Sequence, residues 1–335
     1  IELLYDSLPE VLSQLIRTAF IPSEGHRFIV ADFSAIEARV IAWLAGEEWV
    51  LEEFRGEGKI YEANASRMFR TPVDKIVKGN PEYALRKKGK VATLACGYQG
   101  GPNALIAMGA LEEGLTEEEL PGIVNAWRQA NPHIVEYWHM VQDAAIRTIE
   151  TGIPEELSHG IRFELQNKIL FIRLPSGRRL AYLSPRIVNN RFGGLSISYA
   201  GVKQQSRAWG RLETYGGKLV ENIVQATARD CLRDAMLALD QAGYRTVMHI
   251  HDEAVIDVPT AVSDCMENRC SPYGWYDPDN CPEGCELSDL CRKIWRRDSK
   301  TVLEDVCEIM GRPLPWAPGL PLRADGCELD YYRKE

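Results

Sequence analysis

The sequence predicts an α+β fold, in which a small antiparallel sheet with packed helices is interrupted by a large, mostly helical insertion. Two observations support this prediction. Short apolar runs that end at acidic residues stand far apart in the chain, at 27–33 and at 246–258. Most of the sequence between them has apolar residues at helical spacing, apart from a segment with strand character at 151–200.

The composition limits the class of protein. The 335 residues carry a net charge of -9, which argues against a general polyanion binder but is compatible with a local basic groove. No apolar run reaches the roughly 18–20 residues that span a bilayer, and the N-terminus lacks a signal-peptide pattern. We therefore expect a cytoplasmic protein without a membrane segment. The chain opens on Ile1 rather than Met, as a fragment would.

The first strand and helix follow from the pattern near the N-terminus. The run RFIVADF at 27–33 is apolar and ends at an acid, which indicates a strand. In SAIEARVIAWLAG, Ile36, Val40 and Leu44 recur at helical spacing, and Gly46 is a typical helix end. Residues 48–70 continue as helices that are broken at RGEGK.

The later elements alternate between helix and strand signals. Their expected order is a helix over 81–101 that starts at Pro81, helices over 117–149, strands over 151–200 around a Pro-Ser-Gly turn, a long helix over 203–242, a hairpin over 246–258 and a helix over 302–310. The hairpin bends at His251, Asp252 and Glu253, which is an unusual place for two adjacent carboxylates.

Asp32 and the hairpin acids are candidate metal ligands. If the two strand regions are neighbours in one sheet, Asp32, Asp252 and Glu253 meet at one edge as a hard oxygen site suited to Mg²⁺. Two such ions about 3.5–4 Å apart would support phosphoryl or nucleotidyl transfer. A structural alternative is that Asp32 caps the following helix and that Ser34 and Glu37 form a capping box.

A basic helix face is the second candidate. In RKKGK, Arg86 and Lys90 lie one turn apart and share a face that Leu94 and Tyr98 continue. A guanidinium and an ammonium at this spacing can bind a triphosphate, and an aromatic ring can stack on a base. A solvated basic face is the alternative.

On the long helix, Gln225 lies among apolar residues, either as a contact to the nucleic-acid minor groove or as a satisfied amide in the core.

In order and spacing, these stretches resemble three motifs of the family A DNA polymerases, the bacterial polymerase I type, and especially their divergent bacteriophage versions. VADFSAIEARVIAWLAG resembles motif A. RKKGKVATLACGYQGG, within 81–101, resembles motif B on the O helix, and HIHDEAVID, within 249–258, resembles motif C. The resemblance implies a palm in two parts, 1–50 and 206–335, around fingers at 51–205. It implies that the thumb and the exonuclease domain lie outside these residues.

The resemblance also implies roles for single residues. Asp32, Asp252 and the backbone carbonyl of Phe33 would hold two Mg²⁺ ions, with Glu253 in support. At the nucleotide, Arg86 and Lys90 would bind the triphosphate, Lys90 would donate a proton, and Glu37 would be a steric gate against ribose. Tyr61 and Leu94 stand at positions that pack against the incoming nucleotide, and Tyr98 stands at the position beside the templating base. At the DNA, Gln225 and His251 would contact the primer-template. The partners implied are dNTPs, primer-template DNA and a thumb, exonuclease or replication protein elsewhere on the polypeptide, in a bacterial host cell.

Several positions depart from the family pattern. Phe33 replaces a tyrosine, Ala35 a glutamine, Leu94 an aromatic residue and Gln99 a glycine, and none of these changes removes a metal ligand. The activity implied is template-directed DNA synthesis in phage or prophage replication. The alternatives are a catalytically weak module that binds primer-template DNA or a partner protein, and a single-subunit RNA polymerase, which Glu37 disfavours.

A cysteine-rich insertion at 263–300 stands apart from these motifs. Its five cysteines follow the spacing C-x4-C-x10-C-x3-C-x5-C and are Cys265, Cys270, Cys281, Cys285 and Cys291. Four thiolates could bind a structural Zn²⁺ that would order a loop poor in apolar residues. Disulfides or free thiols are the alternatives.

Overall fold

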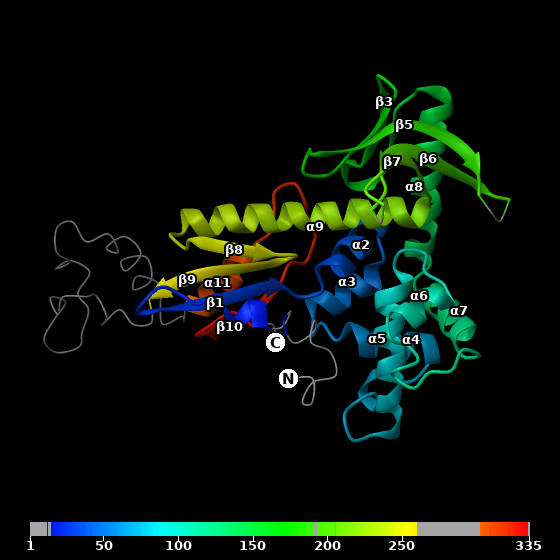
Figure 1. The fold of residues 1–335 in the computed structure, drawn as a ribbon. Helices are drawn as coiled ribbons and strands as arrows, with labels where there is room; N and C mark the ends of the chain where they lie inside the picture. Colours follow the sequence, from blue (N-terminus) through cyan, green and yellow to red (C-terminus); the bar gives the residue numbers. More distant parts are fainter. Residues whose placement is uncertain (1–11, 13–14, 191–192, 205, 260–301, 334–335) are drawn as a thin grey trace, which may run out of the picture. The chain divides into compact units, whose positions relative to one another are not determined.

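The computed structural model describes residues 12, 15–190, 193–204, 206–259 and 302–333 (Figure 1). The chain forms two compact units. Unit 1 comprises Ile1–Ser34, Arg229–Arg312 and Leu322–Glu335, and unit 2 comprises Ala35–Ala228 and Pro313–Pro321. The expected palm and fingers bounds at residues 50 and 205 describe functional subdomains and stay predictions.

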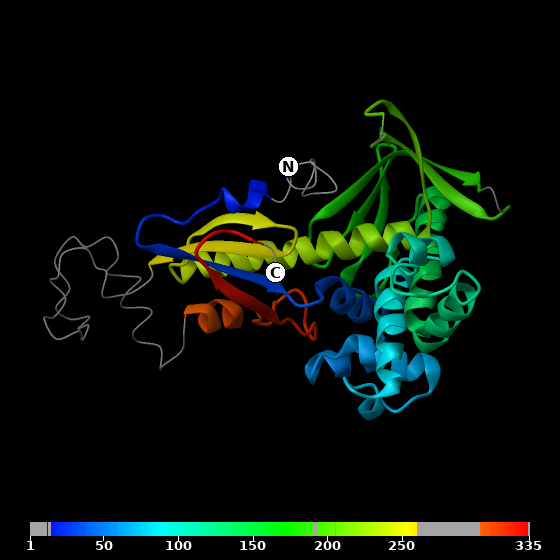
Figure 2. The same cartoon turned by 60° about the horizontal axis from the view of Figure 1, so that its bottom comes forward.

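Unit 1 is built on a four-stranded antiparallel sheet in the order β10-β1-β9-β8 (Figure 2). Its strands are β1 (His26–Phe33), β8 (Thr246–Ile250), β9 (Glu253–Pro259) and β10 (Ala324–Leu329). The predicted strand at 27–33 and the predicted hairpin are confirmed. The hairpin strand β9 pairs directly with β1. Strand β10 comes from the tail, where the sequence ADGCEL has few β-branched residues and no strand was predicted.

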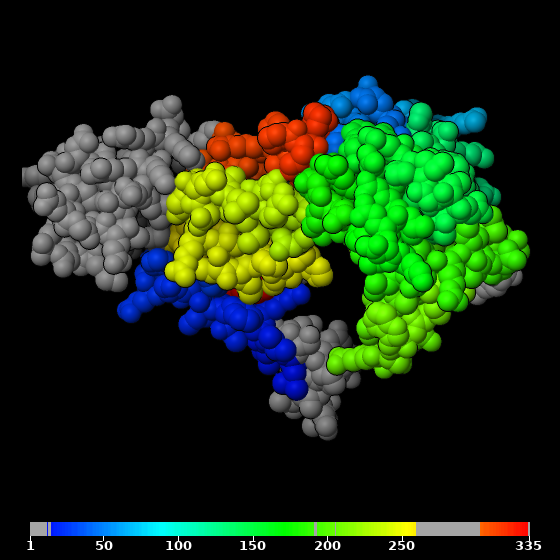
Figure 3. Space-filling model, turned by 90° about the horizontal axis from the view of Figure 1, so that it is seen from above, coloured from blue at the N-terminus to red at the C-terminus, as the bar shows by residue number. Residues whose placement is uncertain are grey.

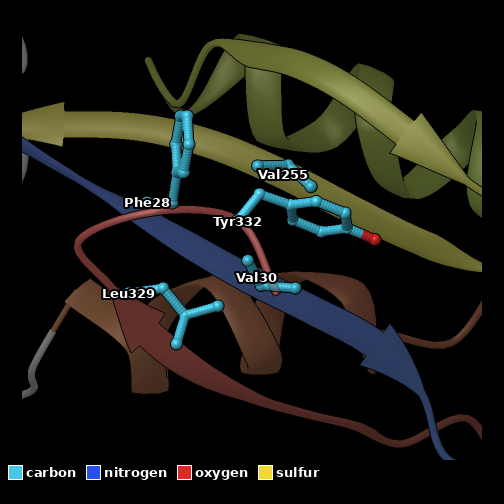
Figure 4. Packing of buried hydrophobic residues seen from close by; sticks show 5 residues of the cluster. All are labelled: Phe28, Val30, Val255, Leu329 and Tyr332. Atoms are coloured by element: carbon cyan, nitrogen blue, oxygen red, sulfur yellow. The ribbon is translucent and has the colours of Figure 1, made fainter. Parts of the chain in front are cut away.

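The two faces of this sheet follow the alternation of β1. Phe28 and Val30 lie on one face, in a buried cluster with Val255, Leu329 and Tyr332 (Figure 4). The opposite face of β1 is also buried, and helix α11 (Val302–Met310) packs against β1 and β10. Because fully burying each large apolar side chain contributes about 1.5–3 kcal/mol, this core fixes the register of the strands.

Helices form the first half of unit 2. They are α2 (Ile36–Ala45), α3 (Glu48–Arg55), α4 (Ile60–Phe69), α5 (Ala84–Cys96), α6 (Pro102–Ala107), α7 (Leu120–Ala130) and α8 (Pro132–Thr151), with short 3₁₀ turns η1 (Val73–Lys75), η2 (Pro81–Tyr83) and η3 (Ser158–Gly160). The predicted end of α2 at Gly46 is confirmed, because this glycine adopts φ 71° and its N–H closes the helix. Helix α5 approaches α4 so closely that a Cβ on Gly89 would lie 2.2 Å from the Tyr61 carbonyl oxygen.

A six-stranded antiparallel sheet forms the second half of unit 2. Its order is β2-β3-β4-β5-β6-β7, with β2 (Glu155–Glu156), β3 (Arg162–Gln166), β4 (Ile169–Arg173), β5 (Arg179–Asn189), β6 (Leu195–Val202) and β7 (Trp209–Thr214). Phe163, Leu170 and Ile172 are buried on the face that α8 covers. This sheet confirms the strands predicted over 151–200.

The long helix α9 (Gly216–Gln241) starts later than the sequence predicted. The expected helix from residue 203 is wrong, because 209–214 pair with β6 as strand β7. Tertiary pairing overrides local propensity here. The helix begins at two glycines because a Cβ would lie 2.2 Å from the Trp138 carbonyl oxygen at Gly216 and 2.4 Å from that of Tyr98 at Gly217. Residues 216–228 belong to unit 2 and residues 229–241 to unit 1.

None of the helices in the described part of the chain has the length and the apolar composition needed to cross a membrane.

Candidate active site

Three carboxylates stand side by side at one end of the unit 1 sheet. Asp32, near the end of β1, lies directly opposite Glu253 on β9 and opposite Asp325 on β10. The predicted convergence of Asp32 with the hairpin acids is therefore confirmed. Asp325 was not predicted, because its strand gave no local signal. Like charges directly opposite each other on a sheet destabilise it unless a cation lies close by.

Asp252 lies in the turn between β8 and β9. The turn consists of His251 and Asp252, and Glu253 is already the first residue of β9. His251 adopts φ 53°, a left-handed conformation that is uncommon for residues other than glycine, and its side chain is exposed. This strained turn places Asp252 next in sequence to the carboxylate that faces Asp32.

A tyrosine from the tail holds one of these carboxylates. The Tyr332 hydroxyl donates a hydrogen bond of 2.8 Å to Glu253 Oε1, and the tyrosine residue is 1% exposed. In Figure 4 its ring lies over Val30 and Val255. Burial, and then the hydrogen bond to Glu253, raises the pKa of Tyr332 to about 12. Glu253 is therefore held by a donor that stays protonated at neutral pH.

The donor chemistry of this sheet end suits Mg²⁺. Asp32 and Asp252 offer carboxylate oxygens, and the buried side chain of Phe33 anchors the backbone whose carbonyl was predicted to help. Arg323 balances one of the charges through Asp325 at 3.2 Å. The match is one of donor type and not of ligand geometry, because within the described ranges no group of three or more His, Cys, Asp or Glu side chains is arranged to hold a metal ion.

Helix α5 carries the basic face in unit 2. Lys90 is exposed and Leu94 is 46% exposed, so this face is open along the helix. Arg86 is held by a neighbour that the sequence did not predict, since its Nε donates to Glu62 Oε1 at 2.6 Å. Its guanidinium also lies 5.4 Å from the centre of the Tyr61 ring. The paired carboxylate orients Arg86 but occupies a group that was predicted to bind phosphate.

Glu37 does not form the capping box. The N-cap of α2 is Ala35 in a left-handed conformation, and the helix has no side-chain cap hydrogen bond, so capping by Asp32 is wrong as well. Instead, the Tyr98 hydroxyl donates a hydrogen bond of 2.6 Å to Glu37 Oε2. Burial, and then the charge of Glu37, raises the pKa of Tyr98 well above its ordinary value. Two residues predicted to act at the nucleotide are thus linked to each other.

The other predicted residues have different outcomes. Gln225 is exposed on α9, so the alternative of a core amide is wrong. Gln99, which replaces a family glycine, accepts a hydrogen bond from the N–H of Gly217 at 3.1 Å, which ties the end of the motif B segment to the start of α9. The cysteines at 265–291 lie outside the described residues, and structural zinc stays a prediction.

An antiparallel sheet that ends in carboxylates, interrupted by an insertion with a basic helix, fits the class of nucleic-acid polymerase domains that the sequence predicted. Comparisons with known proteins specify the family. The family model described as DNA polymerase family A matches residues 9–155. A DNA polymerase of Bacillus phage SP02 is 54% identical over 336 residues, which cover 100% of this chain and 45% of the relative. The chain belongs to DNA polymerase family A.

Two more distant matches are also polymerases. The thermostable DNA polymerase I of Thermus aquaticus is 26% identical over 252 residues, or 74% of this chain and 24% of that protein. The solved POL domain of Pol1 from M. smegmatis, in complex with DNA primer-template and dNTP, matches with a TM-score of 0.54 and 20% identity. This match covers 95% of this chain and 42% of the other, and it supports the fold. The chain thus spans less than half the length of these relatives.

Proposed function

We propose that this chain is the polymerase domain of a template-directed DNA polymerase. It adds dNTPs to a primer 3′ end during phage or prophage replication in the cytoplasm of a bacterial host. The observation that carries the proposal is the register of Asp32 with Glu253, next to the turn that holds Asp252. Sequence identity of 54% with a phage DNA polymerase supports the same function.

The acids of unit 1 would hold two Mg²⁺ ions. Asp32 and Asp252 would ligate both ions, with the carbonyl of Phe33 as a further oxygen donor. When bound, two such ions activate the primer hydroxyl and neutralise charge on the departing oxygen. Glu253 supports the site from the neighbouring strand, with its orientation set by the hydrogen bond from Tyr332.

The basic face of α5 would bind the triphosphate. Arg86 can form a bidentate pair with phosphate oxygens once the nucleotide displaces the Glu62 carboxylate, which now occupies its Nε. Lys90 is exposed and has no competing partner among the ion pairs of the described residues, so it is suited to bind phosphate and to donate a proton to pyrophosphate.

Glu37 would act as a gate against ribonucleotides. Its hydrogen bond from Tyr98 fixes the carboxylate, and a fixed group discriminates by size better than a mobile one. Tyr61 and Leu94 would pack against the nucleotide. Exposed Gln225 and His251 would contact the primer-template, and further segments of the polypeptide or replication proteins would complete the assembly.

Primer extension on the purified chain tests the proposal. We expect extension with dNTPs and Mg²⁺, and its loss in Asp32→Ala with unchanged folding by circular dichroism. Glu37→Ala should admit ribonucleotides, and Tyr98→Phe should admit them to a smaller degree, because only the hydrogen bond to Glu37 is lost. Extension that Asp32→Ala leaves intact would refute the assignment, and absent extension with retained DNA binding would favour a binding module.

A further inference from the structure

The six-stranded sheet of unit 2 is basic within an acidic chain. Residues 155–214 contain ten Lys and Arg but four Asp and Glu, whereas the whole chain has a net charge of -9. A local excess of positive charge against such a background requires a reason, because it raises repulsion within the folded unit. The positions of the arginines on the sheet indicate that reason.

Three arginines form a row across adjacent strands. Arg162 on β3 lies directly opposite Arg173 on β4, which lies directly opposite Arg179 on β5. Directly opposed residues of an antiparallel sheet are about 4.5–5.5 Å apart at Cα, and like charges there are destabilising. The row extends over roughly 10 Å, which exceeds the rise of about 3.4 Å between successive phosphates of one strand in a duplex, so its guanidinium groups can contact more than one phosphate.

The row is only partly neutralised by its own sheet. Arg162 pairs with Glu164 at 2.7 Å, and the guanidinium of Arg179 lies 4.5 Å from the centre of the Phe171 ring. Arg173 is exposed between them. One carboxylate thus accompanies three guanidinium groups, and a ring that stacks on Arg179 orients its charge without cancelling it.

The arginine row points away from the protein core. On the opposite face, Phe163, Ile172 and Tyr182 are buried, and α8 packs on that side. Side chains alternate between faces, so the arginines occupy the open face. Figure 3 shows that the green segment, which includes this sheet, forms part of the molecular surface in that view.

An exposed aromatic side chain lies on the same face. The register of Leu183 with Ala200, and of Val202 with Trp209, continues the arginine face onto β6 and β7. Because β6 runs antiparallel to β5, Trp209 lies toward the end of the sheet where Arg179 begins β5. Trp209 is 66% exposed and lies directly opposite Val202, which is 53% exposed, so the two form an exposed apolar patch of the kind that marks interaction sites.

We propose that the face formed by Arg162, Arg173, Arg179 and Trp209 binds single-stranded DNA, namely the unpaired template strand. The guanidinium groups would contact phosphates, and Trp209 would stack on an unpaired base. Stacking selects a single strand, because base faces within a duplex are already covered by their neighbours. The identity of the strand rests on the proposed function, but binding at this face requires neither metal ions nor catalysis.

Fluorescence anisotropy with a labelled oligothymidine, in EDTA and without dNTPs, tests the proposal across a salt series. We expect the double variant Arg173→Ala/Arg179→Ala to bind more weakly and to lower the slope of log affinity against log salt by about 1.4, at ~0.7 per phosphate contact. Trp209→Ala should weaken binding on the order of 5- to 100-fold while the slope stays unchanged. Arg147→Ala is the control, since this exposed arginine pairs with Glu155 at 3.0 Å.

Three outcomes would overturn this assignment. The first is that the double variant and Trp209→Ala both bind the oligothymidine with an affinity within twofold of the wild type. Another is an equal loss in the control Arg147→Ala. The third is an equal loss on a blunt duplex, which would indicate a duplex surface. Primer extension separates this proposal from the polymerase activity: arginine-dependent binding without extension refutes the activity alone, and extension with arginine-independent binding refutes the DNA-binding face alone.

Discussion

The substitution Tyr332→Phe removes one hydroxyl group and leaves the buried ring in place. The hydroxyl donates to Glu253 Oε1 at 2.8 Å, and the ring lies in the core cluster beside Val30 and Val255. A hydrogen bond to a charged group contributes about 1.5–3 kcal/mol to stability. Because Glu253 is half-buried and water can replace the lost donor, we expect a loss of about 1–2 kcal/mol in the free energy of unfolding at pH 7.

The pH dependence of the same substitution has a definite sign. Burial, and then Glu253, raises the pKa of Tyr332 to about 12 in the folded chain, against about 10 for an unfolded tyrosine. The folded state therefore holds the phenol proton more tightly. Its contribution to stability is fully present below about pH 10 and is lost as the pH rises toward 12. The variant lacks this titration, so the difference in the free energy of unfolding between wild type and variant should shrink as the pH rises from about 10 toward 12.

Urea denaturation at pH 7, 9 and 11 measures both effects. Tyr331→Phe is the matched control. Tyr331 is the next residue in the chain and is 39% exposed, so its substitution should change the free energy of unfolding by less than about 0.5 kcal/mol. If Tyr332→Phe and Tyr331→Phe have the same stability at pH 7, the hydrogen bond does not hold Glu253. A difference from wild type that stays constant up to pH 11 would refute the pKa argument alone.

Two further predictions concern helix α5. Glu62→Gln removes the carboxylate charge beside Arg86 Nε, so we expect a severalfold lower KM for dNTPs in steady-state extension. An unchanged or higher KM would contradict competition between Glu62 and phosphate. Gly89→Ala places a Cβ 2.2 Å from the Tyr61 carbonyl oxygen, so the free energy of unfolding should fall by at least about 2 kcal/mol. Gly122→Ala on α7 is the control: its Cβ meets nothing within 4 Å, and the free energy of unfolding should rise by about 0.5–1 kcal/mol. Thermal unfolding of both variants measures these changes.

Elements with strong local signals could be predicted from the sequence. Strand β1 combines an unbroken apolar run with a terminal acid, and α2 has helical spacing that ends at Gly46. The pairing of Asp32 with the hairpin acids could also be predicted, because both sites end short apolar strands. In each case, the residues that determine the element lie within it.

Elements defined by distant partners could not be predicted. The segment ADGCEL becomes β10 because β1 offers an open edge, and 209–214 become β7 because β6 does. The partners of the site residues were missed for the same reason. Glu62 is 24 positions from Arg86 and Tyr332 is 79 positions from Glu253, and single-sequence patterns carry no information at such separations.

Net charge fails as a guide to nucleic-acid binding in this chain because register, and not composition, decides where the charges gather. The three arginines of the row are 11 and 6 residues apart in sequence, from Arg162 to Arg173 and from Arg173 to Arg179, so the basic excess over residues 155–214 does not by itself make them neighbours. Only the antiparallel pairing of β3, β4 and β5 brings them together. An acidic balance over the rest of the chain limits non-specific adsorption of polyanions, so a compact basic face can bind DNA where the fold places it.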